Sequence, residues 1–437
     1  MRWTLLVLLP FLAAMAPMAR VLSEDPPLPG EPLDGWEALA APADGELDVE
    51  GAVALALERS PELAAYAAEI DAARGARLAA SALPNPTWEL AFRLPDPTLA
   101  SIRVEVDVTD LLLAPIRSGA AGPDVEAARL RAAEAAIRVG YEARAAFFDH
   151  QAALAGWRAA IRAVDGLAAS RDAARAQVAA GNLPLRDLAV REGAYEDARL
   201  RAAALEVDVV TTRERLARRI AGPVPTLSPL LPPAPAALDL PSDPEGDVLA
   251  ASLDLRARDA TLCAARRRTT STALGALVPD VDLFVVREAD GETIGGFEGS
   301  FPLFGVGRGD IIRASAVARG AVADREFADI EVRSAAREAA ARLQSAHARA
   351  LHVQDVIVPV RERVLQETLL QYNAMQVGID VLLLAWRQRI DADVALADTL
   401  RELWTARAAM DALLAGARVA PPRTGAAPTT DTEPGGD

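Results

Sequence analysis

The chain has 437 residues, of which 51% are hydrophobic but only 4% aromatic, and its formal net charge at pH 7 is -16. A surface this acidic repels the phosphates of nucleic acid, so we expect no nucleic-acid partner. Alanine recurs throughout the sequence. Because alanine is the best helix former and has a small side chain, the composition favours long helices that approach one another closely.

Residues 1–19 have the pattern of a secretory signal peptide. Arg2 supplies the positive start, and the apolar stretch from Leu5 to Ala16 is too short to span a bilayer as a helix. No cysteine follows this stretch, so we expect no lipid anchor once the signal peptide is removed. The only cysteine, Cys263, cannot form an internal disulfide. Residues 20–46 are expected to form an extended N-terminal segment.

The remaining sequence contains one structural unit twice. Ser60-Pro61-Glu62-Leu63 matches Ser252-Leu253-Asp254-Leu255, and further matches predict repeats over residues 47–222 and 246–416. The dense prolines of residues 223–245 forbid a helix and predict an extended linker. Residues 417–437 have the composition of a disordered tail.

Each repeat is predicted to run helix, two short strands, long helix, tight turn and long return helix. A helix of about 58 residues would be about 87 Å long, which no compact globular domain needs. Apolar residues on these helices recur at the spacing of antiparallel coiled coils, although an ordinary helical bundle predicts the same spacing. Pro359 is expected to kink its helix. The predicted helices span residues 49–82, 123–180, 184–220, 246–274, 310–375 and 380–415.

The short strands carry the evidence for a membrane. Within residues 102–108, apolar side chains alternate strictly with charged ones. A strand between lipid and a wet channel needs this alternation, but a soluble amphipathic hairpin shows it too. Four strands cannot close a barrel around a channel, so several protomers must share one barrel if the strands cross a membrane. The residues predicted to face lipid are Ile102, Val104, Val106 and Val108.

The sequence offers no catalytic, cofactor or metal site. His150 stands alone, and His347 and His352 are about 140° apart around a helix, which is unsuitable for a shared metal. Residues 305–309 are rich in glycine but lack the Lys-Ser/Thr pair of a phosphate-binding loop. We therefore expect neither an enzyme nor a bound cofactor.

Several motifs, taken in order, resemble the TolC-like outer-membrane efflux family. Residues 47–63 resemble the first helix of that family, and Ala82-Leu83-Pro84-Asn85-Pro86 resembles its approach to the first strand. Residues 300–305 resemble the exit from its strands into a long helix. The likeness covers nearly the whole chain after the signal peptide. It departs from the family at Met375, where the second helix tip often has glycine, and at residues 110–115, which lack the usual glycine.

This resemblance implies a mainly α fold with a small β part. Long antiparallel coiled-coil helices would form an α-barrel, and four strands per protomer would join a trimeric β-barrel. The homotrimer would lie in the outer-membrane lipid of a Gram-negative bacterium and extend into the periplasm. It would act as a passive conduit that receives substrates from a periplasmic adaptor and an inner-membrane pump. The tip residues expected to contact the adaptor are Gly181, Asn182, Leu183, Met375, Gly378 and Ile379.

Two interpretations of the helix tips stay open. Asp187 and Asp380 fall in the first turns of the return helices, where the helix dipole favours a carboxylate. The alternative is that threefold symmetry gathers them into an acidic ring at the channel entrance.

For the whole protein, the alternative is a periplasmic coiled-coil adaptor or interaction protein. An adaptor would have one helical hairpin, whereas this sequence predicts two hairpins, each after a strand pair.

Overall fold

The computed structural model describes residues 46–94, 98–227, 231–300 and 307–419. The signal sequence expected over residues 1–19, the strand exit at 301–306 and the tail beyond 419 lie outside these residues. The described residues from Leu47 onward belong to one structural unit.

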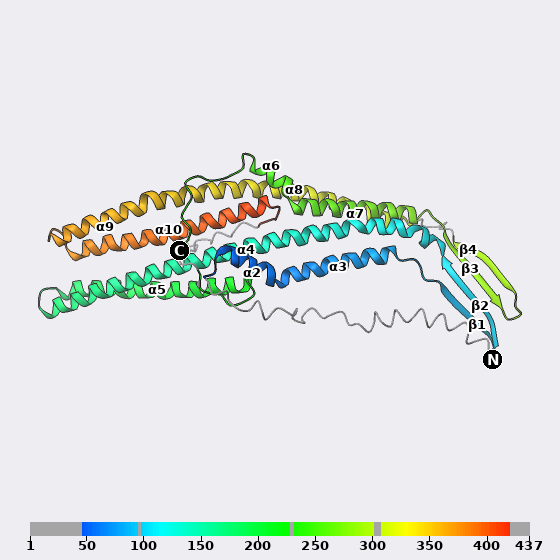
Figure 1. The fold of residues 1–437 in the computed structure, drawn as a ribbon, viewed down its shortest axis with the longest axis horizontal. Coiled ribbons are helices and arrows are strands. Elements are labelled where there is room, and N and C mark those ends of the chain that lie inside the picture. The colour runs from blue at the N-terminus through cyan, green and yellow to red at the C-terminus, as the bar shows by residue number, and fades with distance from the viewer. Residues whose placement is uncertain (1–45, 95–97, 228–230, 301–306, 420–437) are drawn as a thin grey trace, which may run out of the picture. The chain divides into compact units, whose positions relative to one another are not determined.

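This unit contains two halves with the same order of elements (Figure 1). The fold class predicted from the sequence, long helices with one small sheet, is confirmed. The first half comprises α2 (Val49–Arg59), α3 (Pro61–Ser81), β1 (Thr87–Arg93), β2 (Thr98–Asp107), α4 (Val108–Ala179) and α5 (Leu185–Arg219). The second comprises α6 (Pro244–Ala251), α7 (Leu253–Gly275), β3 (Asp280–Glu288), β4 (Thr293–Ser300), α8 (Arg308–His352), the π-helix η1 (Val353–Ile357), α9 (Val358–Asn373) and α10 (Ile379–Leu414).

The first helix of each half is divided, which the sequence prediction missed. Ser60 has φ -68° and ψ 114°, because the proline that follows it disfavours the helical conformation of the preceding residue. Ser252 separates α6 from α7 without a following proline, and its hydroxyl caps α7 by accepting a hydrogen bond from the N–H of Leu255 at 3.3 Å. Both serines therefore end one helix and begin the next.

The longest helix begins earlier than predicted. α4 has 72 residues and starts directly after β2, where the Asp107 carboxylate accepts a hydrogen bond from the N–H of Asp110 at 2.7 Å. Pro115 and Pro123 both lie inside this helix. Proline normally ends a helix, so the sequence placed the start at residue 123. The cap at Asp107 and packing along the helix outweigh that preference.

Next to Pro359, where a kink was expected, the helix departs from regular α geometry. The five-residue π-helix η1 ends just before it, and the proline occupies the first turn of α9. Proline lacks an N–H, and a wider π turn is one way for a helix to absorb an unpaired carbonyl.

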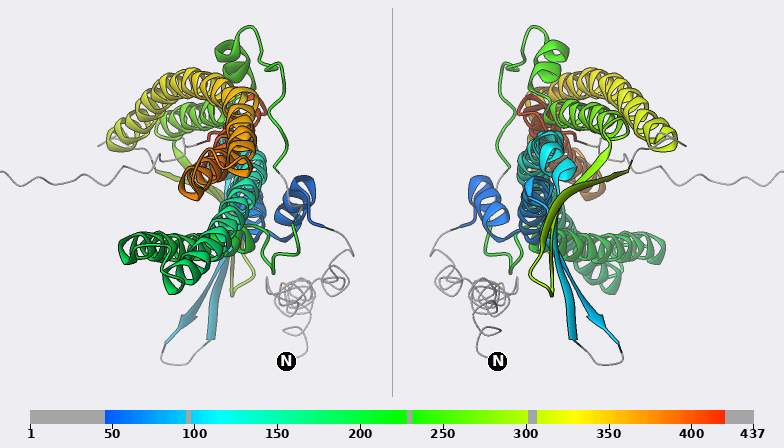
Figure 2. Two further views of the ribbon diagram at one scale, coloured as in Figure 1. Left: turned by 90° about the vertical axis from the view of Figure 1, so that its left-hand side faces the viewer. Right: turned by 90° about the vertical axis from the view of Figure 1, so that its right-hand side faces the viewer.

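The helices form a curved layer with α4 near its middle (Figures 1 and 2). α3 and α5 follow each other along one side of α4, and α7 and α10 follow each other along the other side. α8 and α9 pack against α7 and α10. Many of the buried residues are alanines, such as Ala143, Ala264 and Ala336. Small side chains allow the close approach that the composition predicted.

The linker between the halves lies against the second half. The indole N–H of Trp404 on α10 donates to the carbonyl of Pro232 at 2.8 Å, and Arg407 donates to the carbonyl of Asp239 at 3.0 Å. Gln354 accepts a hydrogen bond from the N–H of Ala234 at 2.9 Å. The proline-rich segment is therefore fastened by its backbone groups to side chains on the helices.

Glycine permits one particularly close contact between helices. A Cβ atom added at Gly166 on α4 would lie 2.1 Å from Cη2 of Trp386 on α10. We predict that Gly166→Ala destabilises the protein by about 1–3 kcal/mol, because the indole ring must move within a packed interface.

Gly156→Ala on the same helix is the matched control, since no atom outside its own helix lies within 4 Å of the added Cβ. This control should gain up to about 1 kcal/mol from helix propensity. Thermal unfolding followed by circular dichroism compares the two, and equal midpoints would contradict the predicted packing.

Candidate membrane surface and channel entrance

The four strands form one antiparallel sheet in the order β1-β2-β3-β4. Directly opposed residues share a face, so the register assigns every side chain to one of two sides. Val104 on β2 lies opposite Trp88 on β1 and Val285 on β3. This side of the sheet is apolar, and we call it the apolar face. Its members are Trp88, Leu90, Ile102, Val104, Val106, Val281, Leu283, Val285 and Phe297.

The other side of the sheet is polar and internally paired. Arg103 Nε lies 2.9 Å from Glu105 Oε2, and the same guanidinium forms an ion pair with Glu298 on β4. The guanidinium also covers the ring of Phe284 at 4.4 Å from its centroid. Arg103, Glu105 and Asp107 thus lie on one face of the sheet. Ile102, Val104 and Val106 lie on the other face, as the alternation indicated.

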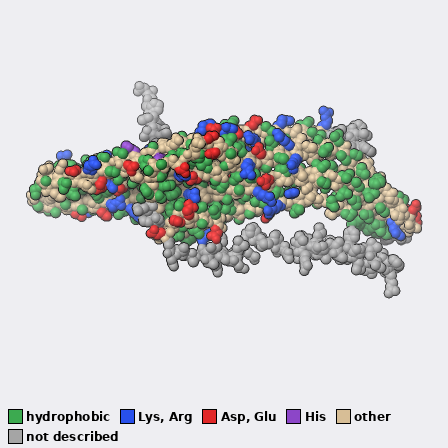
Figure 3. Space-filling view, turned by 45° about the horizontal axis from the view of Figure 1, so that its top comes forward, with side chains coloured by type: hydrophobic (Ala, Val, Ile, Leu, Met, Phe, Trp, Pro, Cys, Tyr) green, Lys and Arg blue, Asp and Glu red, His purple; other side chains and the backbone are tan. Residues whose placement is uncertain are grey.

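Exposure on the two faces is the reverse of that in a soluble sheet. Trp88 is 60% exposed and Phe297 is 74% exposed, both on the apolar face. On the polar face, the side chains of Arg103 and Glu105 on the central strand β2 are each 28% exposed, whereas that of Glu298 on the edge strand β4 is 62% exposed. Figure 3 shows hydrophobic side chains gathered over the strand end, with charged side chains mostly over the helices. A soluble sheet buries its apolar side and exposes its polar side.

Val108, which was predicted to face lipid on the strand, is not part of a strand. β2 ends at Asp107, and Val108 is the first residue of α4. The side chain of Asp107 caps α4 and ends the strand there, so the alternation cannot continue. No helix in the described part of the chain is long and apolar enough to cross a membrane.

The two helix tips lie at the opposite end from the sheet (Figure 1). Gly181 has φ +74° at the first tip, and Met375 has φ +58° at the second. Met375 is therefore a residue other than glycine with a backbone in the left-handed region. Asn182, in the first tip, is exposed, and Gly378 is the N-cap of α10.

Of the three apolar side chains expected at the tips, Leu183, Met375 and Ile379, only Met375 is strongly exposed. Leu183 and Ile379 are half-buried. Their neighbours are more exposed, with Leu185 at 73% and Met375 at 93%. The first turn of a return helix turns some positions inward and others outward, which the sequence of a tip does not specify.

Asp380 has a partner that the sequence did not indicate. Its Oδ1 lies 3.1 Å from Nη2 of Arg191 on α5. The Asp380 side chain is 76% exposed, whereas that of Arg191 is 10% exposed. The pair joins the helical hairpins of the two halves near their tips. Asp187, the other predicted entrance residue, is half-buried in the first turn of α5.

The curved helical layer has two free edges. On α5, Leu200 and Val207 are 75% and 63% exposed and lie roughly opposite the buried residue Ala202. On α8, Ile312 and Ile330 are both 64% exposed and share one side of the helix. Leu78 on α3 is 71% exposed as well. Large apolar side chains are therefore exposed on helices that have no neighbour on one side.

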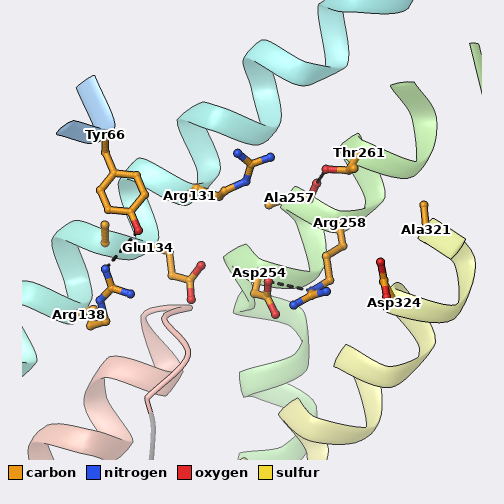
Figure 4. A pocket seen from close by; sticks show the side chains of 11 residues that line it. Tyr66, Arg131, Glu134, Arg138, Asp254, Ala257, Arg258, Thr261, Ala321 and Asp324 are labelled. Atoms are coloured by element: carbon orange, nitrogen blue, oxygen red, sulfur yellow. Dashed lines mark hydrogen bonds and ion pairs between the residues drawn. The ribbon is translucent and has the colours of Figure 1, made fainter. Parts of the chain in front are cut away.

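A polar cavity of about 320 Å³ lies between α3, α4, α7 and α8 (Figure 4). Within it, Arg138 is paired with Glu62 and lies 3.4 Å from the hydroxyl of Tyr66. Burial raises the pKa of Glu134, whose carboxylate accepts the backbone N–H of Arg418 at 3.1 Å. The hydrogen bond from Arg418 to Glu134 thus holds the chain after α10 against α4.

His150 and His347 each lie within hydrogen-bond distance of another group of the protein. His150 is 4% exposed, and its Nδ1 lies 3.0 Å from the hydroxyl of Thr212. Burial lowers the pKa of His150. His347 Nε2 lies 2.7 Å from the carbonyl of Pro235 in the linker. Among the described residues, no three His, Cys, Asp or Glu side chains are arranged to hold a metal ion.

Solved structures with the same architecture were found, whereas no protein-family model and no curated protein matches the sequence. The outer membrane protein VceC of Vibrio cholerae is 17% identical, with a TM-score of 0.69 over 84% of this chain and 96% of that chain. The CmeC outer membrane channel of Campylobacter jejuni is 13% identical, with a TM-score of 0.71 over 84% and 85%.

The open state of the MtrE outer membrane channel of Neisseria gonorrhoeae is 19% identical, with a TM-score of 0.69 over 84% of this chain and 89% of that chain. In each case the match includes most of both chains. Together with the doubled helix–strand–hairpin order and the single four-stranded sheet, these matches show that the chain has the fold of the TolC-like outer-membrane channels.

Proposed function

We propose that the chain is one subunit of a homotrimeric channel in the outer membrane of a Gram-negative bacterium. The observation that carries this proposal is the reversed exposure of the sheet. Apolar side chains such as Trp88 and Phe297 are open to the surroundings, while Arg103 and Glu105 are partly covered. Lipid is the solvent in which such a face is stable, and the polar face then lines a wet channel.

The sheet edges support the trimer. β1 and β4 each pair with one neighbour only, so each has a row of unpaired backbone groups. Hydrocarbon cannot satisfy these groups, and the sheet must close by pairing β1 of one protomer with β4 of the next. The free helix edges at Leu78 and Ile312 would meet in the same way.

The helices would continue the channel as a tube away from the membrane. A hollow of about 1210 Å³ is lined by residues of α4, α5, α8 and α10, including Arg342 and Arg401. Among the lining residues, Arg342 on α8 lies about 140° around the helix from His347, and Glu402 on α10 lies about 160° from Trp404, the two residues that contact the linker. The hollow would form part of the inner wall of the tube.

The proposed role is a passive conduit in a tripartite efflux or secretion system. The exposed apolar side chains Leu185 and Met375 at the tips would contact a periplasmic adaptor protein, through which the channel meets an inner-membrane pump. Membrane fractionation tests the class of protein. Heat-sensitive trimers in the outer membrane are expected, and a soluble periplasmic monomer would indicate an interaction protein instead.

The first prediction concerns the lipid-facing side of the sheet. Val104→Arg should destabilise the membrane-inserted protein by about 2–4 kcal/mol, because it places a charge in hydrocarbon. Thr87→Arg is the control, since Thr87 lies on the polar face opposite Glu105. Urea unfolding in lipid vesicles measures both variants. Equal destabilisation by the two substitutions would contradict the placement of the apolar face in the membrane.

The second prediction concerns the boundary between protomers. Leu78 lies near the sheet end of α3, and Ile312 lies near the sheet end of α8. In a Cys263→Ala background, Leu78→Cys with Ile312→Cys should give trimers with a short bifunctional thiol reagent. Leu78→Cys with Val360→Cys is the control, because Val360 is on α9, far from the sheet. Crosslinking in neither pair, or equally in both, would contradict this arrangement.

The third prediction separates an acidic ring from an ion pair at the entrance. If Asp380 mainly holds Arg191, Asp380→Asn and Arg191→Gln should each raise single-channel conductance, and the double variant should resemble either single one. We expect a coupling energy of about 1 kcal/mol, since only one partner is buried. If Asp380 acts in an acidic ring, Asp380→Asn and Asp187→Asn should lower cation selectivity, whereas Arg191→Gln should not.

A further inference from the structure

The apolar face of the sheet is short for a membrane-spanning surface. The strands have seven to ten residues. At about 3.3 Å per residue and a tilt of about 40°, they reach about 18–25 Å along the membrane normal. On β3 the apolar face runs only from Val281 to Val285, because Arg287 follows on the same side. That stretch covers about 10 Å, whereas the apolar band of such barrels is about 25 Å tall.

Exposed apolar side chains continue beyond the sheet onto the helix ends. Four helix ends lie at the same end of the sheet, namely the end of α3, the start of α4, the end of α7 and the start of α8, where Asp310 and Arg313 form an exposed ion pair. Large exposed hydrophobic residues lie on or just beyond the first three. We call this set the apolar collar. Its members are Leu83 at 64%, Leu111 at 41%, Leu112 at 66%, Ile116 at 39% and Leu277 at 71% exposed.

The start of α4 has one apolar side and one charged side, as a helix at the boundary between lipid and water needs. Leu112 and Ile116 lie one turn apart on one side of the helix. Asp110 and Arg117 form an ion pair and lie about 120–140° around the axis from the middle of this side. Along the exposed apolar side, the first charged residue is Glu126. This side therefore stays uncharged for the first turns of α4, although the helix has already begun.

The apolar stretch on the sheet and the apolar start of α4 together are as tall as the apolar band of such barrels. From Asp107 to Ile116, α4 rises about 14 Å. Added to the apolar stretch of about 10 Å on β3, this gives about 24 Å, close to the usual band. A short hydrophobic span otherwise thins the bilayer around it, which costs free energy for each ångström of mismatch.

We propose that the apolar collar is embedded in the acyl chains of the inner leaflet of the outer membrane, so that the hydrocarbon boundary crosses α4 near Ile116 rather than the end of the strands. This inference rests on the proposed function, since it requires the sheet to lie in the outer membrane. It adds that part of the membrane-embedded surface is helical. Phospholipid acyl chains are the partner, because the collar is continuous with the apolar face and has no charge on its exposed side.

Spin labels at single cysteines in a Cys263→Ala background test the position of the boundary. The trimer in phospholipid vesicles is labelled at Leu112→Cys, with Leu277→Cys as a second collar site. Val104→Cys reports the sheet, and Glu126→Cys reports the water side of the same helix face. Collisions with oxygen, which concentrates in lipid, are compared with collisions with a water-soluble nickel chelate.

We expect both collar labels to resemble Val104→Cys, with frequent oxygen collisions and few nickel collisions, while Glu126→Cys shows the opposite. Collar labels that resemble Glu126→Cys would overturn the proposal and leave the channel intact. Collar labels hidden from both reagents would overturn it too, since they would be covered by a neighbouring protomer. If Val104→Cys itself collides freely with nickel, the proposed function fails as well.

Discussion

The unpaired backbone groups along β1 and β4 set a requirement that the rest of the molecule must meet. A sheet with one apolar face can lie between lipid and water, but hydrocarbon offers no hydrogen bonds to its edges. Four strands are too few to close on themselves around a channel. In the proposed channel the edges therefore pair with other copies, and each protomer forms a segment of a ring.

The helices fit this requirement because they form a layer and not a compact bundle. A compact bundle would bury the apolar stripe of each helix against several neighbours, whereas here α4 packs between two lines of helices and the outermost helices keep a free apolar side. Buried alanines, and glycine where the ring of Trp386 lies against Gly166, keep neighbouring axes close. Close, nearly parallel packing transmits the curvature of the layer from the sheet to the tips.

Two kinds of contact fix the layer along its length. Near the middle, backbone carbonyls of the linker accept hydrogen bonds from Trp404 and Arg407. Near the tips, Arg191 and Asp380 join the two hairpins across the layer. The linker carbonyls of Pro232 and Asp239 belong to exposed residues, and an ion pair with one exposed partner adds little stability, so neither contact alone fixes the layer.

The sequence alone determined the elements whose signal is local. Alternation over residues 102–107 specified both faces of β2, and the coiled-coil spacing specified long helices, since each pattern repeats the geometry of its own element. Only the tertiary structure decided where α4 begins. The helix continues through Pro115 although proline disfavours it, and Val108 belongs to the helix and not to the strand because Asp107 caps the helix. It also decided the partner of Asp380, because a contact between residues 191 and 380 depends on how two hairpins pack, and no local pattern records that.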